Sequence, residues 1–287
     1  MKTIDRFILI ILAVSFTFCL TSCSTNSTKE DGSDVTSTDN QDSKTESVSE
    51  DNFKWKDNII TGLTDVGAKQ KVLVIPERCE GFQEPIFSYI ENSVLEVSFE
   101  SDKDIALNGA FRCASNLEKI FLPQELSNID DMDFWACSNL QSISIPAGIL
   151  EIGGYAFQDD TALKSVNFEG NITSIKAHAF DGCTSLEEIS FPASVLSIEE
   201  YAFYGCTSLE TVKLPETIST IGGFAFANGG LSNLYVPSAV EFSSYDTTSF
   251  IQASSTVSVY VVSDSWCDVN FEEVFEGGSF EKNYFEE

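Results

Sequence analysis

The sequence is poor in histidine and in basic residues. It contains one histidine in 287 residues, and its 16 lysines and arginines stand against 45 aspartates and glutamates, which gives a formal net charge of −29. A chain this acidic repels the phosphates of DNA and RNA and gains nothing from an anionic lipid surface. A single histidine leaves little room for a histidine-rich metal site or for catalysis by imidazole. We therefore expect no nucleic-acid partner, no bound metal and no cofactor.

The apolar run at the N-terminus is too short to cross a bilayer as a helix. It covers residues 7–20 and follows Lys2 and Arg6, an arrangement typical of a signal peptide. The run ends in Leu-Thr-Ser-Cys at residues 20–23, which resembles the lipobox of bacterial lipoproteins. The resemblance implies that residues 1–22 are removed as a signal peptide and that lipidated Cys23 anchors the chain in a membrane. An ordinary signal peptide with a chance cysteine near its end is the alternative.

Residues 24–50 contain almost nothing that could be buried. Twelve of these 27 residues are serine or threonine, seven are acidic, and only Val35 and Val48 are aliphatic. Such a segment cannot form a core and repels itself by charge. We therefore assign residues 23–54 to the lipidated cysteine and a disordered tether.

Phenylalanine recurs at a fixed interval of 23 residues, and its neighbours recur with it. In most copies an aliphatic residue stands five and eight positions before the phenylalanine, and the pattern L-x-x-φ-x-φ-P follows it, where φ is aliphatic or aromatic. A single 23-residue coil cannot bury its apolar side, so coils must stack on one another. The recurring residues are Phe111, Phe134, Phe157, Phe180, Phe203 and Phe226.

The φ-x-φ stretch of each unit, such as residues 143–145, has the period of a β-strand. Equivalent strands of successive coils should pair in parallel, roughly 4.8 Å apart. The sequence thus predicts a β-rich leucine-rich-repeat solenoid with one parallel sheet and short irregular segments on its convex side.

The unit resembles the 23-residue repeat of the BspA-like family of bacterial surface proteins, also known from treponemal leucine-rich-repeat proteins. The matching segments are residues 152–157 (IGGYAF), 179–186 (AFDGCTSL) and 202–209 (AFYGCTSL). The resemblance covers about residues 55–262. It implies a protein of the cell surface that takes part in adhesion or in binding host or bacterial partners.

The ends of the solenoid depart from the repeat, as terminal caps do. We expect a solenoid over residues 55–262, with an N-terminal cap over residues 55–99, regular repeats over about 100–237 and an irregular end over 238–262. Residues 263–287 would form a C-terminal cap.

Three details of these ends follow from the pattern. A strand is expected at residues 72–75, and Ser88 takes the phenylalanine position of a degenerate coil. After Pro237 the 23-residue register is lost, and a further strand is expected at residues 257–262. The apolar residues of the C-terminal tail suggest a short final helix; they are Trp266, Phe271, Val274 and Phe275.

The cysteines of the repeats look structural. Cys137, Cys183 and Cys206 share one repeat position, which indicates buried thiols. Cys183 and Cys206 lie on neighbouring coils, so a disulfide between them is an alternative. The spacing C-x₂-C of zinc sites is absent.

Neither the histidine nor the acidic pairs suggest catalysis. His178 occupies a variable position of the coil surface, and a nucleophilic pair with Cys183 would need a third, orienting group that the sequence does not indicate. The acidic pairs at residues 130–133, 159–160 and 199–200 are expected in solvated turns. We expect no catalytic residue.

Residues that flank the buried strand positions point to the open face of the sheet, because strand side chains alternate. The middle of this face is a field of hydroxyl and amide groups, and aromatic residues lie toward its ends, where they could anchor a partner. The candidate partner-binding residues are Phe121, Ser144, Asn167, Ser190, Lys213 and Tyr235.

The sequence therefore favours a non-catalytic bacterial surface lipoprotein that lies outside the cytoplasm. It would bind a protein or another cell-surface macromolecule through the broad face of its solenoid. Two alternatives stay open: a spacer without a specific ligand and, with less support, a surface hydrolase. No nucleophile elbow, metal cluster or phosphate loop supports the hydrolase.

Overall fold

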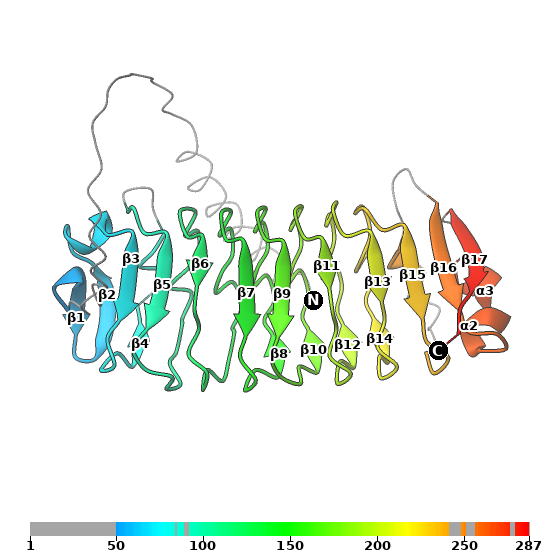
Figure 1. The fold of residues 1–287 in the computed structure, drawn as a ribbon, viewed down its shortest axis with the longest axis horizontal. Helices are drawn as coiled ribbons and strands as arrows, with labels where there is room; N and C mark the ends of the chain where they lie inside the picture. The colour runs from blue at the N-terminus through cyan, green and yellow to red at the C-terminus, as the bar shows by residue number, and fades with distance from the viewer. Residues whose placement is uncertain are drawn as a thin grey trace, which may run out of the picture. The chain divides into compact units, whose positions relative to one another are not determined.

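The computed structural model describes residues 50–83, 85–88, 92–240, 248–250, 256–275 and 279–286. They belong to one compact unit, Val48–Glu287. The expected signal peptide, Cys23 and residues 24–49 of the tether lie outside the described residues. The chain of the described unit winds into a solenoid of about nine turns, which confirms the predicted fold (Figure 1).

One long row of strands runs along the solenoid, with one strand from each turn (Figure 1). Every neighbouring pair that is hydrogen-bonded in this row is parallel. The row comprises three hydrogen-bonded sheets, in the order β3-β5-β6, then β7-β9-β11, then β13-β15-β16-β17. The strands are β3 (Val72–Ile75), β5 (Glu96–Phe99), β6 (Lys119–Ile120), β7 (Ser142–Ile145), β9 (Ser165–Phe168), β11 (Glu188–Ile189), β13 (Thr211–Lys213), β15 (Asn233–Val236), β16 (Val257–Val261) and β17 (Phe280–Tyr284).

A second row of parallel strands, which forms one further sheet, adds to the single sheet that the sequence predicts. It forms because the aliphatic residue five positions before each phenylalanine also pairs with its counterpart on the next coil, as Ile152 does with Ile175. An isolated bridge between Ile129 and Ile152 extends the same row by one coil. The strands of this sheet are β8 (Glu151–Ile152), β10 (Ser174–Ile175), β12 (Ser197–Ile198) and β14 (Thr220–Ile221).

A column of stacked phenylalanine rings runs through the interior. From Phe111 to Phe226 the ring centroids of successive coils lie 5.1–5.4 Å apart, and the rings are within 10° of parallel. None of these six rings is more than 2% exposed. The 23-residue interval thus places identical rings in contact on every turn.

The column continues past both ends of the regular repeats. Phe87, and not Ser88, takes the phenylalanine position of the degenerate first coil, with its ring 4.7 Å from that of Phe111. At the other end Phe250 stacks 5.5 Å from Phe226, so the stacking persists beyond Pro237. Both intervals are 24 residues instead of 23. A search for a strict 23-residue period therefore does not find Phe87 and Phe250.

The three thiols of the shared repeat position are buried and not bridged. Cys137, Cys183 and Cys206 are each at most 2% exposed, and none of the three forms a disulfide. Burial raises the pKa of the Cys183 thiol well above its ordinary value. These cysteines therefore act as small core residues, as the repeat pattern predicts.

The N-terminal cap closes the first coil with a hairpin. Strands β1 (Phe53–Lys56) and β2 (Ile59–Leu63) pair antiparallel, and β2 pairs in parallel with β4 (Gly81–Phe82). Strand β1 begins inside the segment that the sequence assigns to the tether, and Phe53 is only 4% exposed. Two 3-10 helices, η1 (Glu50–Asn52) and η2 (Gly67–Lys69), flank the hairpin. The expected strand Val72–Ile75 is confirmed as β3.

The C-terminal cap differs from the single short helix that was expected. It contains two four-residue helices, α2 (Trp266–Val269) and α3 (Phe271–Val274), and then β17, which adds a further strand to the row. Phe275 lies between Phe250, with ring centroids 6.2 Å apart, and Phe280, at 5.0 Å. The aromatic residues of the tail thus cover the open end of the phenylalanine column.

Each regular coil bends at two positions where the backbone has a positive φ. One lies two residues before the core phenylalanine and the other two residues after it. Only glycine adopts this left-handed conformation without strain, yet most coils place larger residues there. The first position holds Gly109, Met132, Tyr155, His178, Tyr201 and Phe224, and the second holds Cys113, Ala136, Asp159, Gly182, Gly205 and Asn228.

This geometry predicts opposite effects for two substitutions at the second position. Ala136→Gly should raise the free energy of unfolding by about 1 kcal/mol, because it relieves a φ of 61°. Gly205→Ala should lower the free energy of unfolding by about 1 kcal/mol, because its φ is 71°. The new methyl group meets nothing closer than 3.8 Å, so a steric clash does not add to this cost. Urea unfolding of both variants measures the two values. Effects of the same sign would contradict the role of backbone strain.

The phenylalanine column predicts a large cost for removing one ring. Phe180→Ala should lower the free energy of unfolding by about 3–5 kcal/mol, because it leaves a cavity between two coils that stay in place. Phe121→Ala is the matched control, since this ring is 57% exposed and its removal should change stability by less than about 0.5 kcal/mol. Equal losses for the two variants would show that the stack does not hold the coils together.

Candidate functional site

The candidate pair of His178 and Cys183 and the possible metal ligands can be placed within the described part of the chain. No group of three or more histidine, cysteine, aspartate or glutamate side chains among those residues could hold a metal ion. His178 Nδ1 lies 2.8 Å from Asp181 Oδ2, and its ring lies between those of Tyr155 and Tyr201 at 4.7 and 4.8 Å. Cys183 is fully buried. The histidine is therefore part of a surface stack of rings and does not form an accessible pair with the thiol.

No helix within the described ranges is long and apolar enough to cross a membrane.

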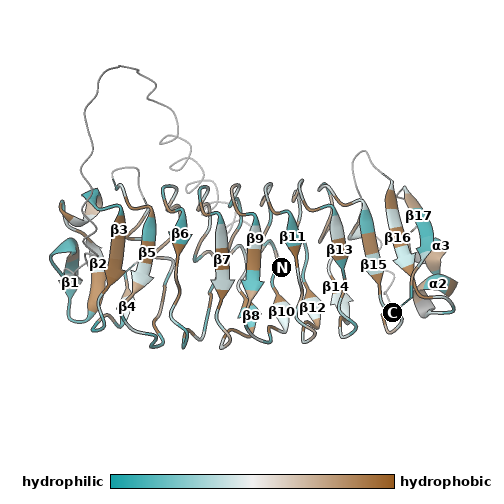
Figure 2. Cartoon of the chain, in the orientation of Figure 1, coloured by the Kyte–Doolittle hydropathy of each residue, from teal (hydrophilic) through white to brown (hydrophobic). Residues whose placement is uncertain are grey.

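The open face of the long row of strands, which we name the strand face, carries the candidate residues. Along β7 the buried side chains of Ile143 and Ile145 alternate with the exposed Ser142 and Ser144. The strand register then places Asn167 beside Ser144, and the Asn167 amide donates a hydrogen bond to the Ser144 hydroxyl at 3.3 Å. In Figure 2, β3 is hydrophobic along its length, whereas strands in the middle of the row mix polar and hydrophobic residues.

Phe121 is the exposed aromatic residue at the N-terminal part of this face. It follows β6 directly, and its backbone amide donates to the Val97 carbonyl at 3.0 Å. Its ring is 57% exposed. The backbone is thus held in place while the ring remains accessible to a partner.

Tyr235, at the other end of the face, lies in a cluster of aromatic rings. Its ring stacks on Tyr260 with centroids 4.5 Å apart and an interplanar angle of 8°, and Phe285 meets it edge-on at 5.5 Å. Lys213 Nζ lies 5.4 Å from the Tyr235 ring centroid. We name Tyr235, Tyr260 and Phe285 the terminal aromatic cluster.

Tyr260 and Phe285 were not predicted from the sequence as part of the strand face. Strand β16 pairs with β15 at an offset of 25 residues, Tyr235 to Tyr260, instead of 23. The alternation of buried valines at 257, 259 and 261 could have placed Tyr260 on the open face. Phe285 follows β17, a strand that no repeat pattern indicated.

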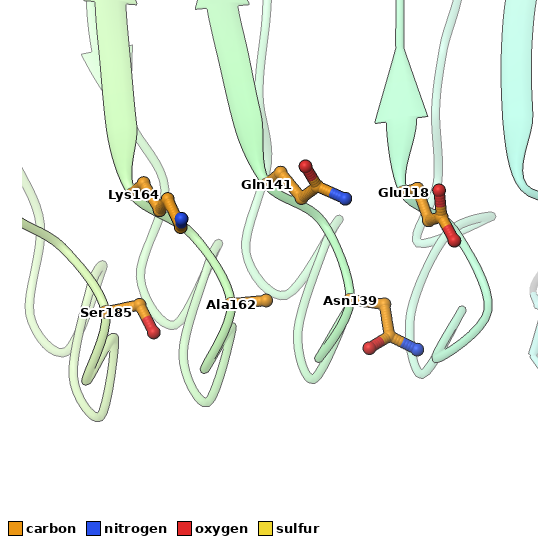
Figure 3. A pocket seen from close by; sticks show the side chains of 6 residues that line it. All are labelled: Glu118, Asn139, Gln141, Ala162, Lys164 and Ser185. Carbon is orange, nitrogen blue, oxygen red and sulfur yellow. The ribbon is translucent and has the colours of Figure 1, made fainter.

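A shallow depression of about 350 Å³ adjoins the middle of this face (Figure 3). Its side chains come from positions just before β6, β7 and β9 and from the turns beside them, and Figure 3 shows Glu118, Gln141 and Lys164 on successive coils. The lining is mostly polar, with one carboxylate, two amides, one ammonium group and one hydroxyl. The lining residues are Glu118, Asn139, Gln141, Ala162, Lys164 and Ser185.

The expectation that all the acidic pairs lie in solvated turns is wrong for two aspartates. Asp133 is 1% exposed, and its carboxylate accepts hydrogen bonds from the backbone amides of Gly109 and Asp130, both at 2.7 Å. Asp160 is fully buried, because it occupies the interior repeat position of the thiols. Glu199, in contrast, lies on the surface and pairs with Lys176 at 3.4 Å.

Comparison with known proteins agrees with this architecture. The family model described as "BspA type Leucine rich repeat region" matches residues 67–187 and 175–282. No curated protein matches the chain significantly.

Three solved structures are among those that match most of the chain at low identity. A leucine-rich cell surface protein of Faecalibacterium prausnitzii is 17% identical, with 80% of this chain and 83% of that chain covered and a TM-score of 0.39. The pneumococcal vaccine antigen PcpA is 15% identical, with coverage of 76% and 80% and a TM-score of 0.42. The T. pallidum leucine-rich-repeat protein is 23% identical, with coverage of 78% and 89% and a TM-score of 0.38.

The two ranges that the family model matches overlap and together extend from residue 67 to residue 282, which is well over half of the chain. The chain therefore belongs to the family of BspA-type leucine-rich-repeat proteins.

Proposed function

We propose that this protein is a non-catalytic lipoprotein of the bacterial cell surface that binds a protein or another surface macromolecule through the open face of its strands. The observation that carries the proposal is the arrangement of this face. An exposed aromatic ring at Phe121 and the terminal aromatic cluster lie at either end of a field of small polar groups.

The dimensions of the face suit a macromolecule. Phe121 and Tyr235 belong to coils five steps apart in the row, which corresponds to roughly 24 Å at a strand spacing of about 4.8 Å. Aromatic residues dominate the binding energy of many interfaces, and polar groups around them supply hydrogen bonds. The polar depression beside β6, β7 and β9 gives a partner further hydrogen-bonding groups within the same area.

The charge on the face supports recognition by contact more than by long-range attraction. Among its outward positions Glu96, Glu188 and Glu281 carry negative charge, and Lys119 and Lys213 carry positive charge. The face is therefore nearly neutral although the chain is strongly acidic.

The proposed location rests on the N-terminal sequence. A lipidated Cys23 and a tether of charged and hydroxyl residues would hold the solenoid away from the membrane and leave its strand face accessible.

The first test removes the two aromatic anchors. We expect the unit formed by residues 48–287 to capture a partner from extracellular-matrix or cell-envelope extracts, and the double variant Phe121→Ala and Tyr235→Ala to bind it at least about tenfold more weakly. The affinity is measured on the identified partner by surface plasmon resonance.

The control for this test is the double variant Leu150→Ala and Leu196→Ala. These two side chains are 59% and 47% exposed but lie beside the second sheet, away from the strand face. The control should bind as the wild type does. Equal losses in both double variants would contradict the strand face as the binding site, and a failure to capture anything would favour the spacer.

The second test concerns the anchor. Cys23→Ser should release the protein into the medium, because the residue can no longer receive a diacylglycerol, whereas Cys19→Ser should leave it at the membrane. Fractionation and immunoblotting of cells measure the distribution. Membrane retention of the Cys23→Ser variant would rule out the lipid anchor.

A further inference from the structure

One interior position of the coils holds an acid where its neighbours hold thiols. The position lies three residues after the core phenylalanine and is occupied by Cys137, then Asp160, then Cys183 and Cys206. All four side chains are buried, and Asp160 has no exposed surface. The acid therefore lies in a column of neutral groups, with a thiol in the coil before it and another in the coil after it.

Each thiol of the column makes the same hydrogen bond. Its Sγ–H donates to the backbone carbonyl of the phenylalanine 26 residues earlier, on the preceding coil. The distances are 3.0 Å from Cys137 to Phe111, 3.1 Å from Cys183 to Phe157 and 3.2 Å from Cys206 to Phe180. In each of these three coils the side chain at this position thus donates a proton to the preceding coil.

The two carboxyl oxygens of Asp160 have different surroundings. Oδ1 accepts a hydrogen bond from the Cys137 backbone amide at 2.7 Å. Oδ2 is buried and has no hydrogen-bond partner within the part of the chain that the structure describes. The thiols of this column each donate a hydrogen bond to the carbonyl oxygen 26 residues earlier. For Asp160 that oxygen belongs to Phe134, so the repeat makes it the expected acceptor.

We propose that Asp160 is a neutral carboxylic acid in the folded solenoid. Its Oδ2 carries the proton and donates it to the Phe134 carbonyl oxygen, as the thiols of the same column do. A solenoid that holds such a proton becomes less stable as the pH rises, so Asp160 makes the fold sensitive to pH.

The groups around Asp160 favour the neutral form. Burial raises the pKa of this carboxyl well above its ordinary value, the hydrogen bond from the Cys137 amide lowers it, and the neighbouring Asp159 carboxylate raises it further. The groups packed against it from the adjacent coils are the thiols of Cys137 and Cys183, and burial keeps that of Cys183 protonated. An unpaired buried carboxylate is costly, and taking up a proton removes that cost.

The sign of the pH effect follows from linkage. The unfolded chain releases the Asp160 proton near the ordinary pKa of aspartate, about 3.9, whereas the folded chain retains it to higher pH. Below the unfolded pKa both states bind the proton, and this residue makes no pH-dependent contribution. As the pH rises from there toward the folded pKa, the folding equilibrium constant falls by up to about tenfold for each pH unit.

The test compares urea unfolding of the full chain between about pH 5 and about pH 8. The variants are Asp160→Cys, which restores the thiol of the neighbouring coils, and Asp160→Asn, which keeps the shape without a titratable proton. Relative to either variant, the folding equilibrium constant of the wild type should fall by up to about tenfold per pH unit. The control variant Glu188→Gln, on the exposed face, should retain the slope of the wild type.

A second measurement does not depend on how the variants fold. Infrared difference spectra of the wild type against Asp160→Asn at neutral pH should show the carbonyl stretch of a protonated carboxyl group, and isotope-labelled aspartate in the wild type should shift this band. Parallel stability curves for the wild type and both variants, or a carboxylate band in place of the acid band, would overturn the proposal.

Discussion

The contact of one phenylalanine ring with the next is the interaction on which the rest of this structure depends. Each ring lies flat on its counterpart about one strand spacing away, so stacking and strand pairing demand the same separation between coils. A coil without a neighbour would expose its ring and leave its strand unpaired. The solenoid is therefore stable only as a stack, and its two ends need caps, which the hairpin β1–β2 and the aromatic residues around Phe275 provide.

The same register divides the remaining positions into interior and exterior ones. Interior positions repeat because every coil must fill the same space, whereas exterior positions vary from coil to coil. Two rows of exterior positions carry aromatic rings. In the row Tyr155–His178–Tyr201–Phe224 neighbouring rings cover one another's faces, and this row serves the packing of the surface. On the strand face Phe121 is left uncovered, and this accessibility favours the strand face as the binding surface.

Much of the fold could be predicted from the sequence because the period was strict where the coils are regular. The solenoid and the buried thiols followed from residue spacing, and the strand at β3 was expected although no regular unit precedes it. Part of what escaped prediction lay where one or two extra residues shift the period, as at Phe87, Phe250 and Tyr260. A pattern search compares equal intervals, whereas a packed core accepts any loop that brings the next ring onto the stack.

The acidic residues show a related limit of composition. A formal charge of −29 treats every carboxylate as if water surrounded it, but the repeat position decides whether an acid is solvated. Asp133 lies inside and satisfies backbone amides, and Asp160 lies inside in the place of a thiol. On the strand face the charges of Glu188 and Lys213 offset each other on adjacent coils. The charge of the whole chain therefore does not describe the proposed binding surface, and recognition there would depend on rings and hydrogen-bonding groups placed by the stack.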